Sequence, residues 1–267
     1  MNRIEQTLAE LQERGEKAFI TYITAGLPDY GRTEALIRAQ AEAGVDIIEL
    51  GIPFSDPVAD GPVIQAASYD AIQGGATLEK TFLCMEEMRR SGVRIPIIFM
   101  MYYNTVLHYG VEAFAVRCAK AGVDGVIVPD LPYEEQEELK RALLSAEGGS
   151  ETLLIQLVSP VSGARVPMIL KEARGFVYCV SSMGVTGQGG DFHREVVSYL
   201  SRVKEQSDIP VMMGFGICSA ADVAPMKHVV DGVIVGTHFI KLLRENDFDT
   251  DAAAQYCSTF KRELNAR

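Results

Sequence analysis

Short apolar runs alternate with segments of helical period along the whole chain, and this alternation limits the folds that it can adopt. The apolar runs lie at residues 18–24, 45–50, 95–101, 125–128, 153–158, 175–180, 210–213 and 232–235. The segments of helical period lie between them, at 32–43, 77–91, 111–121, 134–145, 166–173, 193–206 and 219–226. Many of the runs are continuous in Val and Ile, which is typical of strands buried on both faces. Eight strand–helix units in about 250 residues predict a (β/α)8 TIM barrel of the α/β class.

Two further helices are expected at the ends of the predicted barrel. Residues 4–14 have an amphipathic pattern ahead of the first strand and are expected to close the bottom of the barrel. Residues 238–243 are expected to form a short helix after the eighth strand, where barrels commonly bind phosphate. The chain contains no low-complexity stretch or long linker, so residues 1–267 are expected to form a single TIM-barrel domain. A doubly wound open sheet is the alternative to the barrel.

A short repeat marks the approach to three of the predicted strands. The sequence Ala-Gly-Val-Asp occurs at 43–46 and 121–124, and Val-Asp-Gly-Val follows a related pattern at 230–233. Each copy places a turn after a predicted helix and directly before a predicted strand, as a helix end that leads into a parallel strand requires.

Composition and charge exclude several classes of function. Of the 267 residues, 48% are hydrophobic and 23% are charged, which is ordinary for a globular protein. The apolar runs are too short to span a bilayer, and the first residues lack the apolar core of a signal peptide, so we expect a cytoplasmic protein without a membrane partner. The net charge of −11 argues against nucleic acid. An anionic ligand would therefore need local backbone donors.

The cysteines and histidines indicate neither a disulfide framework nor a metal site. The five cysteines are scattered, and no pair has Cys-x-x-Cys spacing. Cys179 and Cys218 are interpreted as buried, unreactive thiols near strand ends. The four histidines show no metal-binding spacing, and most are expected to face solvent. We therefore expect no metal.

Residues 48–61, Ile-Glu-Leu-Gly-Ile-Pro-Phe-Ser-Asp-Pro-Val-Ala-Asp-Gly, carry the most specific chemical signal. A strand ends on Glu49, and the loop after it carries Asp56 and Asp60. Alternation along the strand places Glu49 on one face with Val45 and Ile47. Burial there would raise the pKa of Glu49, which suits a group that gives and takes a proton near neutral pH. The other interpretation is a solvated strand-end Glu with a helix-capping Asp.

Several predicted strand ends carry apolar or aromatic side chains. Because barrel active sites lie at the carboxyl ends of the strands, these residues are expected to line a small-molecule chamber. Met100, Tyr102 and Asn104 are expected on one side of the third strand end, with Tyr102 facing Glu49. The expected lining residues are Tyr22, Met100, Tyr102, Ile127, Tyr178, Phe215 and Ile234. Packing in the core or at the rim is the alternative for each of them.

Glycine-rich turns follow the last three predicted strands. They comprise residues 184–190, 214–216 and 236–237. Glycine lets backbone N–H groups approach an anion, and a helix N-terminus adds a favourable dipole. The three turns together predict a phosphate site. Neither a Walker A motif nor a dinucleotide-binding fingerprint is present.

These motifs resemble the tryptophan synthase α family almost from end to end. The matching segments are 23–26, 48–61, 102–104, 128–132, 180–181, 184–187, 214–217 and 235–236. The resemblance implies retro-aldol cleavage of indole-3-glycerol phosphate to indole and glyceraldehyde 3-phosphate. It also implies that this subunit works without a metal or cofactor and passes indole to a pyridoxal-phosphate-dependent β subunit in an α2β2 heterotetramer.

The resemblance also assigns roles to individual residues. It makes Glu49 the acid/base and Asp60 the partner of the indole N–H, with Tyr178 as the active-site tyrosine. It assigns the indole pocket to Tyr22, Met100, Ile127, Phe215 and Ile234. Tyr102 is also expected to bind substrate, because strand alternation makes it face Glu49. It assigns the phosphate cradle to Gly187, Gly216, Gly236 and Thr237 and makes residues 182–191 a lid. Closure of this lid is expected to bring Thr186, a substrate-binding residue, into register with Asp60.

Three positions depart from the family pattern. Ser182 stands where the family usually has Arg, Leu27 replaces a common Asp before Pro28, and residues 158–160 differ at the end of the fifth strand. None removes a catalytic carboxylate. Three other functions stay open: a stand-alone indole-producing lyase, a silent barrel that only activates a β-type partner, and another phosphate-binding barrel enzyme such as a sugar-phosphate isomerase.

Overall fold

The computed structural model describes residues 2–147, 151–180, 190–214 and 216–266, and these form a parallel sheet rolled into a barrel. The strand order is β5-β4-β3-β2-β1-β9-β8-β7-β6. The strands are β1 (Ala18–Thr24), β2 (Ile47–Gly51), β3 (Ile97–Met100), β4 (Gly125–Ile127), β5 (Leu153–Leu154), β6 (Gln156–Val158), β7 (Val177–Val180), β8 (Val211–Gly214) and β9 (Gly232–Val235). The predicted (β/α)8 barrel is confirmed, and the open sheet is excluded.

The fifth strand position is occupied by two short strands instead of one. β5 pairs with β4, and β6 pairs with β7, with Ile155 between them. The predicted strand 153–158 therefore closes the ring by bonding to one neighbour with its first half and to the other with its second half. This division adds a ninth strand without adding a ninth strand–helix unit.

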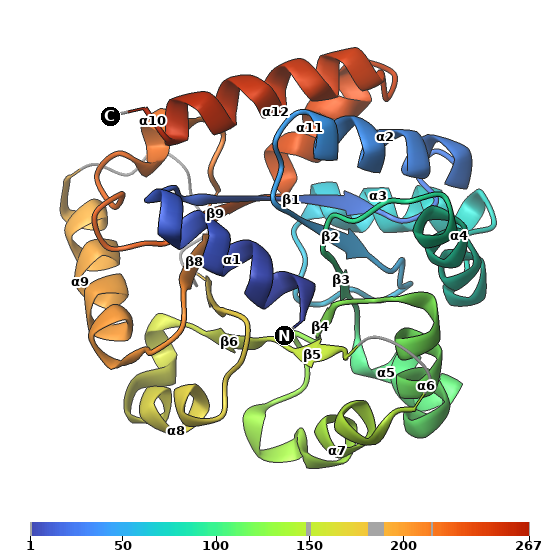
Figure 1. The fold of residues 1–267 in the computed structure, drawn as a ribbon, viewed down its shortest axis with the longest axis horizontal. Helices are drawn as coiled ribbons and strands as arrows, with labels where there is room; N and C mark the ends of the chain where they lie inside the picture. Colours follow the sequence, from blue (N-terminus) through green and yellow to red (C-terminus); the bar gives the residue numbers. More distant parts are fainter. Residues whose placement is uncertain (1, 148–150, 181–189, 215, 267) are drawn as a thin grey trace.

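Helices surround the ring of strands (Figure 1). They are α1 (Arg3–Arg14), α2 (Tyr30–Glu42), α3 (Pro62–Gln73), α4 (Leu78–Arg90), α5 (Tyr103–Tyr109), α6 (Val111–Ala121), α7 (Glu137–Ser145), α8 (Val166–Lys171), α9 (Gly190–Gln206), α10 (Ala220–Val223), α11 (Thr237–Glu245) and α12 (Thr250–Leu264), with 3-10 turns at Tyr133–Glu135 and Pro160–Arg165. The sequence pattern did not predict α3, α5 or α12. It also placed Asn104 on an extended strand end, whereas Asn104 lies in α5.

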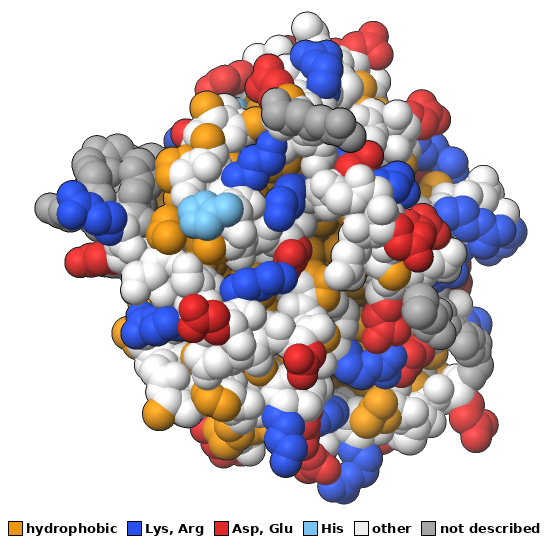
Figure 2. Space-filling model, turned by 60° about the vertical axis from the view of Figure 1, so that its left-hand side comes forward, with side chains coloured by type: hydrophobic (Ala, Val, Ile, Leu, Met, Phe, Trp, Pro, Cys, Tyr) orange, Lys and Arg blue, Asp and Glu red, His pale blue; other side chains and the backbone are white. Residues whose placement is uncertain are grey.

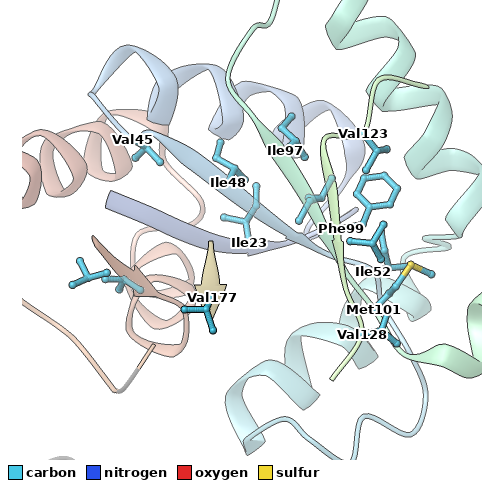
Figure 3. Packing of buried hydrophobic residues seen from close by; sticks show 14 of the residues in the cluster. Ile23, Val45, Ile48, Ile52, Ile97, Phe99, Met101, Val123, Val128 and Val177 are labelled. Carbon is cyan, nitrogen blue, oxygen red and sulfur yellow. The ribbon is translucent and has the colours of Figure 1, made fainter. Parts of the chain in front are cut away.

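Side chains on the outer face of the strands form the main hydrophobic core. Ile48, Ile97 and Phe99 point away from the barrel axis and pack under the surrounding helices (Figure 3). Val45 belongs to this outer core, so the expectation that it shares a face with Glu49 was wrong. The reason is that β2 begins at Ile47, and strand alternation does not extend back into the irregular segment that contains Val45.

Side chains on the inner face fill the barrel, and α1 closes its amino-terminal end. Ile4, Leu8 and Leu11 of α1 are buried against the inward-facing Ile20, Ile98, Leu153, Ile155, Phe176 and Met212. Figure 1 shows α1 lying across the ring of strands. Asn2 caps α1 and also donates from Nδ2 to the carbonyl oxygen of Asp124 (2.9 Å), which ties the helix to β4. The expected closure of the barrel bottom by this segment is confirmed.

The three aspartates of the sequence repeat perform the same task at this end of the barrel. Each carboxylate accepts the backbone N–H at or near the start of the preceding strand in the ring. Phe19 N donates to Asp46 (2.7 Å), Ile97 N to Asp124 (2.8 Å) and Val211 N to Asp231 (2.7 Å). Each aspartate also pairs with a cation: Asp46 with Lys261, Asp124 with Arg3 and Arg89, and Asp231 with Lys204.

The surface mixes both signs of charge. On the face shown in Figure 2, Lys and Arg side chains are interspersed with Asp and Glu, so the acidic surplus is not gathered there. Within the described ranges, no helix combines the length and the apolar character needed to cross a membrane.

We predict that Asp124→Asn lowers the free energy of unfolding by about 3–5 kcal/mol, because it leaves the guanidinium groups of Arg89 and Arg3 without their anion. The Asp124 side chain is fully buried, and its oxygens lie 2.6 Å and 2.7 Å from those groups. Urea unfolding measures the change. Glu137→Gln, in an exposed pair with Arg141, serves as the control and should stay within about 0.5 kcal/mol. A loss below about 1 kcal/mol for Asp124→Asn would contradict the prediction.

Candidate active site

Glu49 lies on the inner face of β2 near its carboxyl end, directly opposite Tyr22 of β1. Its side chain is 1% exposed, and Oε1 has no hydrogen-bond partner among the described residues. Burial raises the pKa of Glu49 from 4.5 to about 8. A carboxyl group in this state can exist in either protonation form near neutral pH, which is the property expected of a general acid/base.

Two tyrosines lie across glycines at the carboxyl ends of neighbouring strands. A Cβ atom at Gly51 would meet Tyr22 Oη at 2.0 Å, and one at Gly214 would meet Tyr178 Oη at 2.4 Å. Only glycine leaves room for these rings. Burial is the main cause that raises the pKa of both tyrosines, and the nearby Glu49 and Asp60 add to it. Both hydroxyls therefore stay neutral at the edge of the chamber.

Asp60 and Tyr102 form a polar pair in the loop above Glu49. Tyr102 Oη donates to Asp60 Oδ2 (2.9 Å) and accepts from the backbone N–H of Ala59 (2.9 Å). The ring of Tyr102 also stacks on Phe54, with the centroids 5.2 Å apart. Burial raises the pKa of Asp60, and the hydrogen bond from Tyr102 partly offsets the rise.

The position of Tyr102 differs from the sequence prediction, which made it face Glu49. β3 ends at Met100, and Tyr102 is the residue that precedes α5, so strand alternation no longer determines its direction. Its hydroxyl donates a hydrogen bond to Asp60 instead. Phe54 had no predicted role, although it stands within the 48–61 string that carried the strongest signal.

The apolar wall of the chamber follows strand alternation. Ile127, Tyr178 and Ile234 belong to the inner cluster, and Met100 packs against both this cluster and the one that contains Tyr22. These predicted residues are therefore brought together. Leu157 and Val180 pack against the same cluster and were not predicted, although each lies two residues beyond another inward position.

The carboxyl ends of β8 and β9 carry the described part of the predicted phosphate site. Gly236 precedes the first turn of α11, and Thr237 is its first residue. The first N–H groups of a helix have no partner within it and can face an anion. Gly216 has a φ of 47°, which only glycine adopts readily. The predicted residues Thr186, Gly187 and Phe215, and the departure at Ser182, lie outside the described residues.

The remaining ionisable motifs do not form a second centre. The described residues contain no group of three or more His, Cys, Asp or Glu side chains placed to hold a metal ion. Cys179 is buried, and burial raises its pKa to about 12, whereas Cys218 is only half-buried. His108 and His228 face solvent, and His238 is half-buried against Tyr256.

The fold and this chamber define a (β/α)8-barrel enzyme with a buried carboxylate at the end of its second strand. Residues 8–267 match the family described as tryptophan synthase alpha chain. A tryptophan synthase alpha chain from Lachnospira eligens is 60% identical over 266 residues and covers 100% of both chains. The chain belongs to the tryptophan synthase alpha chain family.

Solved structures agree with this assignment. The crystal structure of tryptophan synthase subunit alpha from Legionella pneumophila matches with a TM-score of 0.89 at 33% identity, over 99% of this chain and 98% of that one. A chain of Mycobacterium tuberculosis tryptophan synthase matches with a TM-score of 0.88 at 34% identity, over 100% and 99%. The chain is accordingly a carbon–carbon lyase of tryptophan biosynthesis that cleaves indole-3-glycerol phosphate, and its partner is the β subunit.

We predict that Glu49→Gln stabilises the fold relative to the parent by an amount that grows with pH. The pKa of Glu49 is raised on folding, so the parent loses stability as pH rises from about 4.5 to about 8, at up to 1.4 kcal/mol per pH unit. The Gln variant has no such loss. Urea unfolding at pH 6 and pH 8 should show the difference between the two proteins growing by about 2 kcal/mol. Glu137→Gln, which removes an exposed carboxylate, should show no growth, and a constant difference for Glu49→Gln would contradict the raised pKa.

Proposed function

We propose that Glu49 is the acid/base of the cleavage and that Asp60 binds the indole N–H. The observation that carries this proposal is the burial of Glu49 inside an apolar chamber, with no hydrogen-bond partner for its Oε1 among the described residues. Burying a carboxyl group without a structural partner costs free energy. Its presence is best explained by a ligand that it binds or a proton that it transfers. Asp60, which is half-buried and held by Tyr102, is the second carboxylate at the same mouth.

The chemistry of the reaction matches two carboxylates with different surroundings. Cleavage of the bond at indole C3 requires a proton on C3 and removal of the proton from the adjacent glycerol hydroxyl, which becomes the aldehyde. The electron pair of the C3 bond returns to the indole ring. Glu49 gives one proton and takes the other, so it ends in its starting state. Protonation at C3 places positive charge on the ring nitrogen, and the Asp60 carboxylate stabilises this charge.

The other chamber residues hold the substrate in position for this transfer. Met100, Ile127 and Ile234 supply an apolar surface for the indole ring, and Tyr22 and Tyr178 border it. The phosphate is assigned to the turns at Gly216 and Gly236, with the first turn of α11 directed at it. Residues 186 and 187 complete this site in the proposal. The chain's net charge of −11 makes such local donors necessary.

We also propose that residues 1–267 act as a single domain in an α2β2 assembly in the cytoplasm. One ring of strands and one surrounding layer of helices account for the described chain, which supports a single domain. All five cysteines are free, which fits a reducing compartment. Light scattering of the chain mixed with its β subunit tests the stoichiometry.

Glu49→Gln is expected to lower the rate of indole formation from indole-3-glycerol phosphate by at least about 10²-fold, because the amide keeps the shape of the carboxyl but cannot move a proton. Binding of the substrate should persist. The assay follows indole release from the chain with and without the β subunit, and isothermal titration reports binding. Glu137→Gln is the control and should retain the parental rate. Activity within tenfold of the parent would remove Glu49 from its role.

Replacing Gly236 by Leu is expected to weaken glyceraldehyde 3-phosphate about tenfold or more and to leave indole binding unchanged, because the side chain blocks the approach to the backbone donors. Gly236→Ala is the matched control. A Cβ at this position would lie 3.5 Å from Tyr22 Cβ, an ordinary contact, so the alanine should bind both ligands nearly as the parent does. Calorimetric titration with each ligand measures the effect. Equal losses for both ligands would show that the turn has only a structural role.

A further inference from the structure

The chamber contains a second buried oxygen without a partner, and it belongs to a residue that the proposed mechanism has not used. Thr24, the last residue of β1, is 2% exposed, and its Oγ1 makes no hydrogen bond of normal geometry to any residue in the described part of the chain. Glu49 Oε1 is in the same condition on the adjacent strand. A buried hydroxyl left unpaired costs about 1–3 kcal/mol, so two such atoms in one chamber indicate a shared polar ligand.

Strand register places the two oxygens on the same side of the barrel wall. Tyr22 is opposite Glu49, and Thr24 is opposite Gly51. Ile20 and Ile47 face the interior, so the alternation that directs Glu49 inward also directs Tyr22 and Thr24 inward. Thr21, on the other face, instead donates to Gln40 outside the barrel (2.6 Å).

The Tyr22 hydroxyl lies near both of these groups. The Tyr22 ring extends over Gly51, the residue opposite Thr24. The Thr24 hydroxyl is close enough to lower the pKa of Tyr22, against the larger effect of burial, and Glu49 is close enough to raise it. Thr24, Tyr22 and Glu49 therefore form a row of polar groups along the ends of two neighbouring strands.

We propose that Thr24 is a positioning residue for the cleavage: with the Tyr22 hydroxyl it holds one oxygen against Glu49 Oε1, and that oxygen is the reacting glycerol hydroxyl when substrate is bound. This inference rests on the proposed role of Glu49. A hydroxyl can donate and accept at once, so Thr24 can orient Tyr22 while Tyr22 contacts the shared oxygen. The arrangement fixes the direction from which Glu49 takes the hydroxyl proton, which is the positioning that proton transfer requires.

Within the described ranges, the ionisable groups near Glu49 are two tyrosines and one aspartate. Tyr22 comes from β1, Tyr178 from β7, and Asp60 from the loop after β2, where Tyr102 binds it. The tyrosines stay neutral because burial raises their pKa values, and Thr24 does not titrate. With substrate bound, the oxygen that Thr24 and Tyr22 hold is the donor to the Glu49 carboxylate. Loss of the Thr24 hydroxyl weakens that donation and so raises the pKa of Glu49 in the complex.

The experiment compares Thr24→Val, Thr24→Ser and Tyr22→Phe in the chain assembled with its β subunit. Thr24→Val keeps the shape and removes the hydroxyl. We expect it to lower kcat about tenfold with KM within about threefold, and to move the fall in rate above about pH 8 to higher pH. Thr24→Ser should restore both properties nearly to the parent. Thr21→Val is the control and should lose stability without a change in kcat or in the pH profile.

A double-mutant cycle tests whether Thr24 acts through Tyr22. Tyr22→Phe should lower kcat by a similar factor, and adding Thr24→Val to it should have little further effect. Four outcomes would each overturn the inference. Thr24→Val could keep the parental kcat, or lose kcat without a shift of the pH profile. Thr24→Ser could be as impaired as Thr24→Val, or the losses in the double mutant could be additive. An inactive Glu49→Gln beside a fully active Thr24→Val would overturn this inference alone. An active Glu49→Gln would overturn the role of Glu49 itself.

Discussion

The two-residue alternation of side chains along a closed ring of parallel strands is the constraint on which the rest of the molecule depends. Outward residues such as Ile48 and Phe99 attach the helices, and inward residues fill the barrel. Because every strand except the two short ones at the fifth position pairs with a neighbour on each side, the chain cannot shift its register without exposing a whole layer of the core. A carboxylate on the inner face is therefore held in place by every neighbouring strand. Glu49 keeps its position and its raised pKa because the wall around it cannot relax.

The two ends of the barrel divide stability and chemistry between them. At the amino-terminal end, α1 covers the opening, and the aspartates of the sequence repeat are satisfied by backbone N–H groups and by cations. At the carboxyl end, Glu49 and Thr24 are buried with oxygens that no described residue satisfies. The paired aspartates and the covering helix stabilise the amino-terminal end of the barrel. This stability offsets the cost of leaving two buried oxygens unpaired at the carboxyl end.

Much of this arrangement could be predicted from the sequence, and the differences have physical reasons. The repeating apolar runs gave the barrel, and the 48–61 string gave Glu49 and Asp60, because strand burial and ionisable strand ends leave clear local patterns. The side chain of Tyr102 was wrongly predicted to face Glu49, because the sequence pattern does not locate the end of β3 to within one residue. Val45 was assigned to the wrong face for the same reason. The missing α3 and α5 flank turns, where periodicity is weak. Helix α12 buries Ala253, Cys257, Phe260 and Leu264 at helical spacing and could have been predicted from this pattern. Thr24 could have been found by extending the alternation of β1 by one step.

The glycines beneath the two tyrosines have a consequence for how this pocket can change over time. The Tyr22 ring occupies the volume that any side chain at position 51 would need, and Tyr178 does the same at position 214. The side chains at the two positions of each pair therefore compete for the same volume. A larger residue at 51 or 214 is compatible only with a smaller residue at 22 or 178, so the two positions of each pair are expected to vary together among sequences. Redesign of the chamber for a substrate with a different ring would have to substitute both residues of such a pair together.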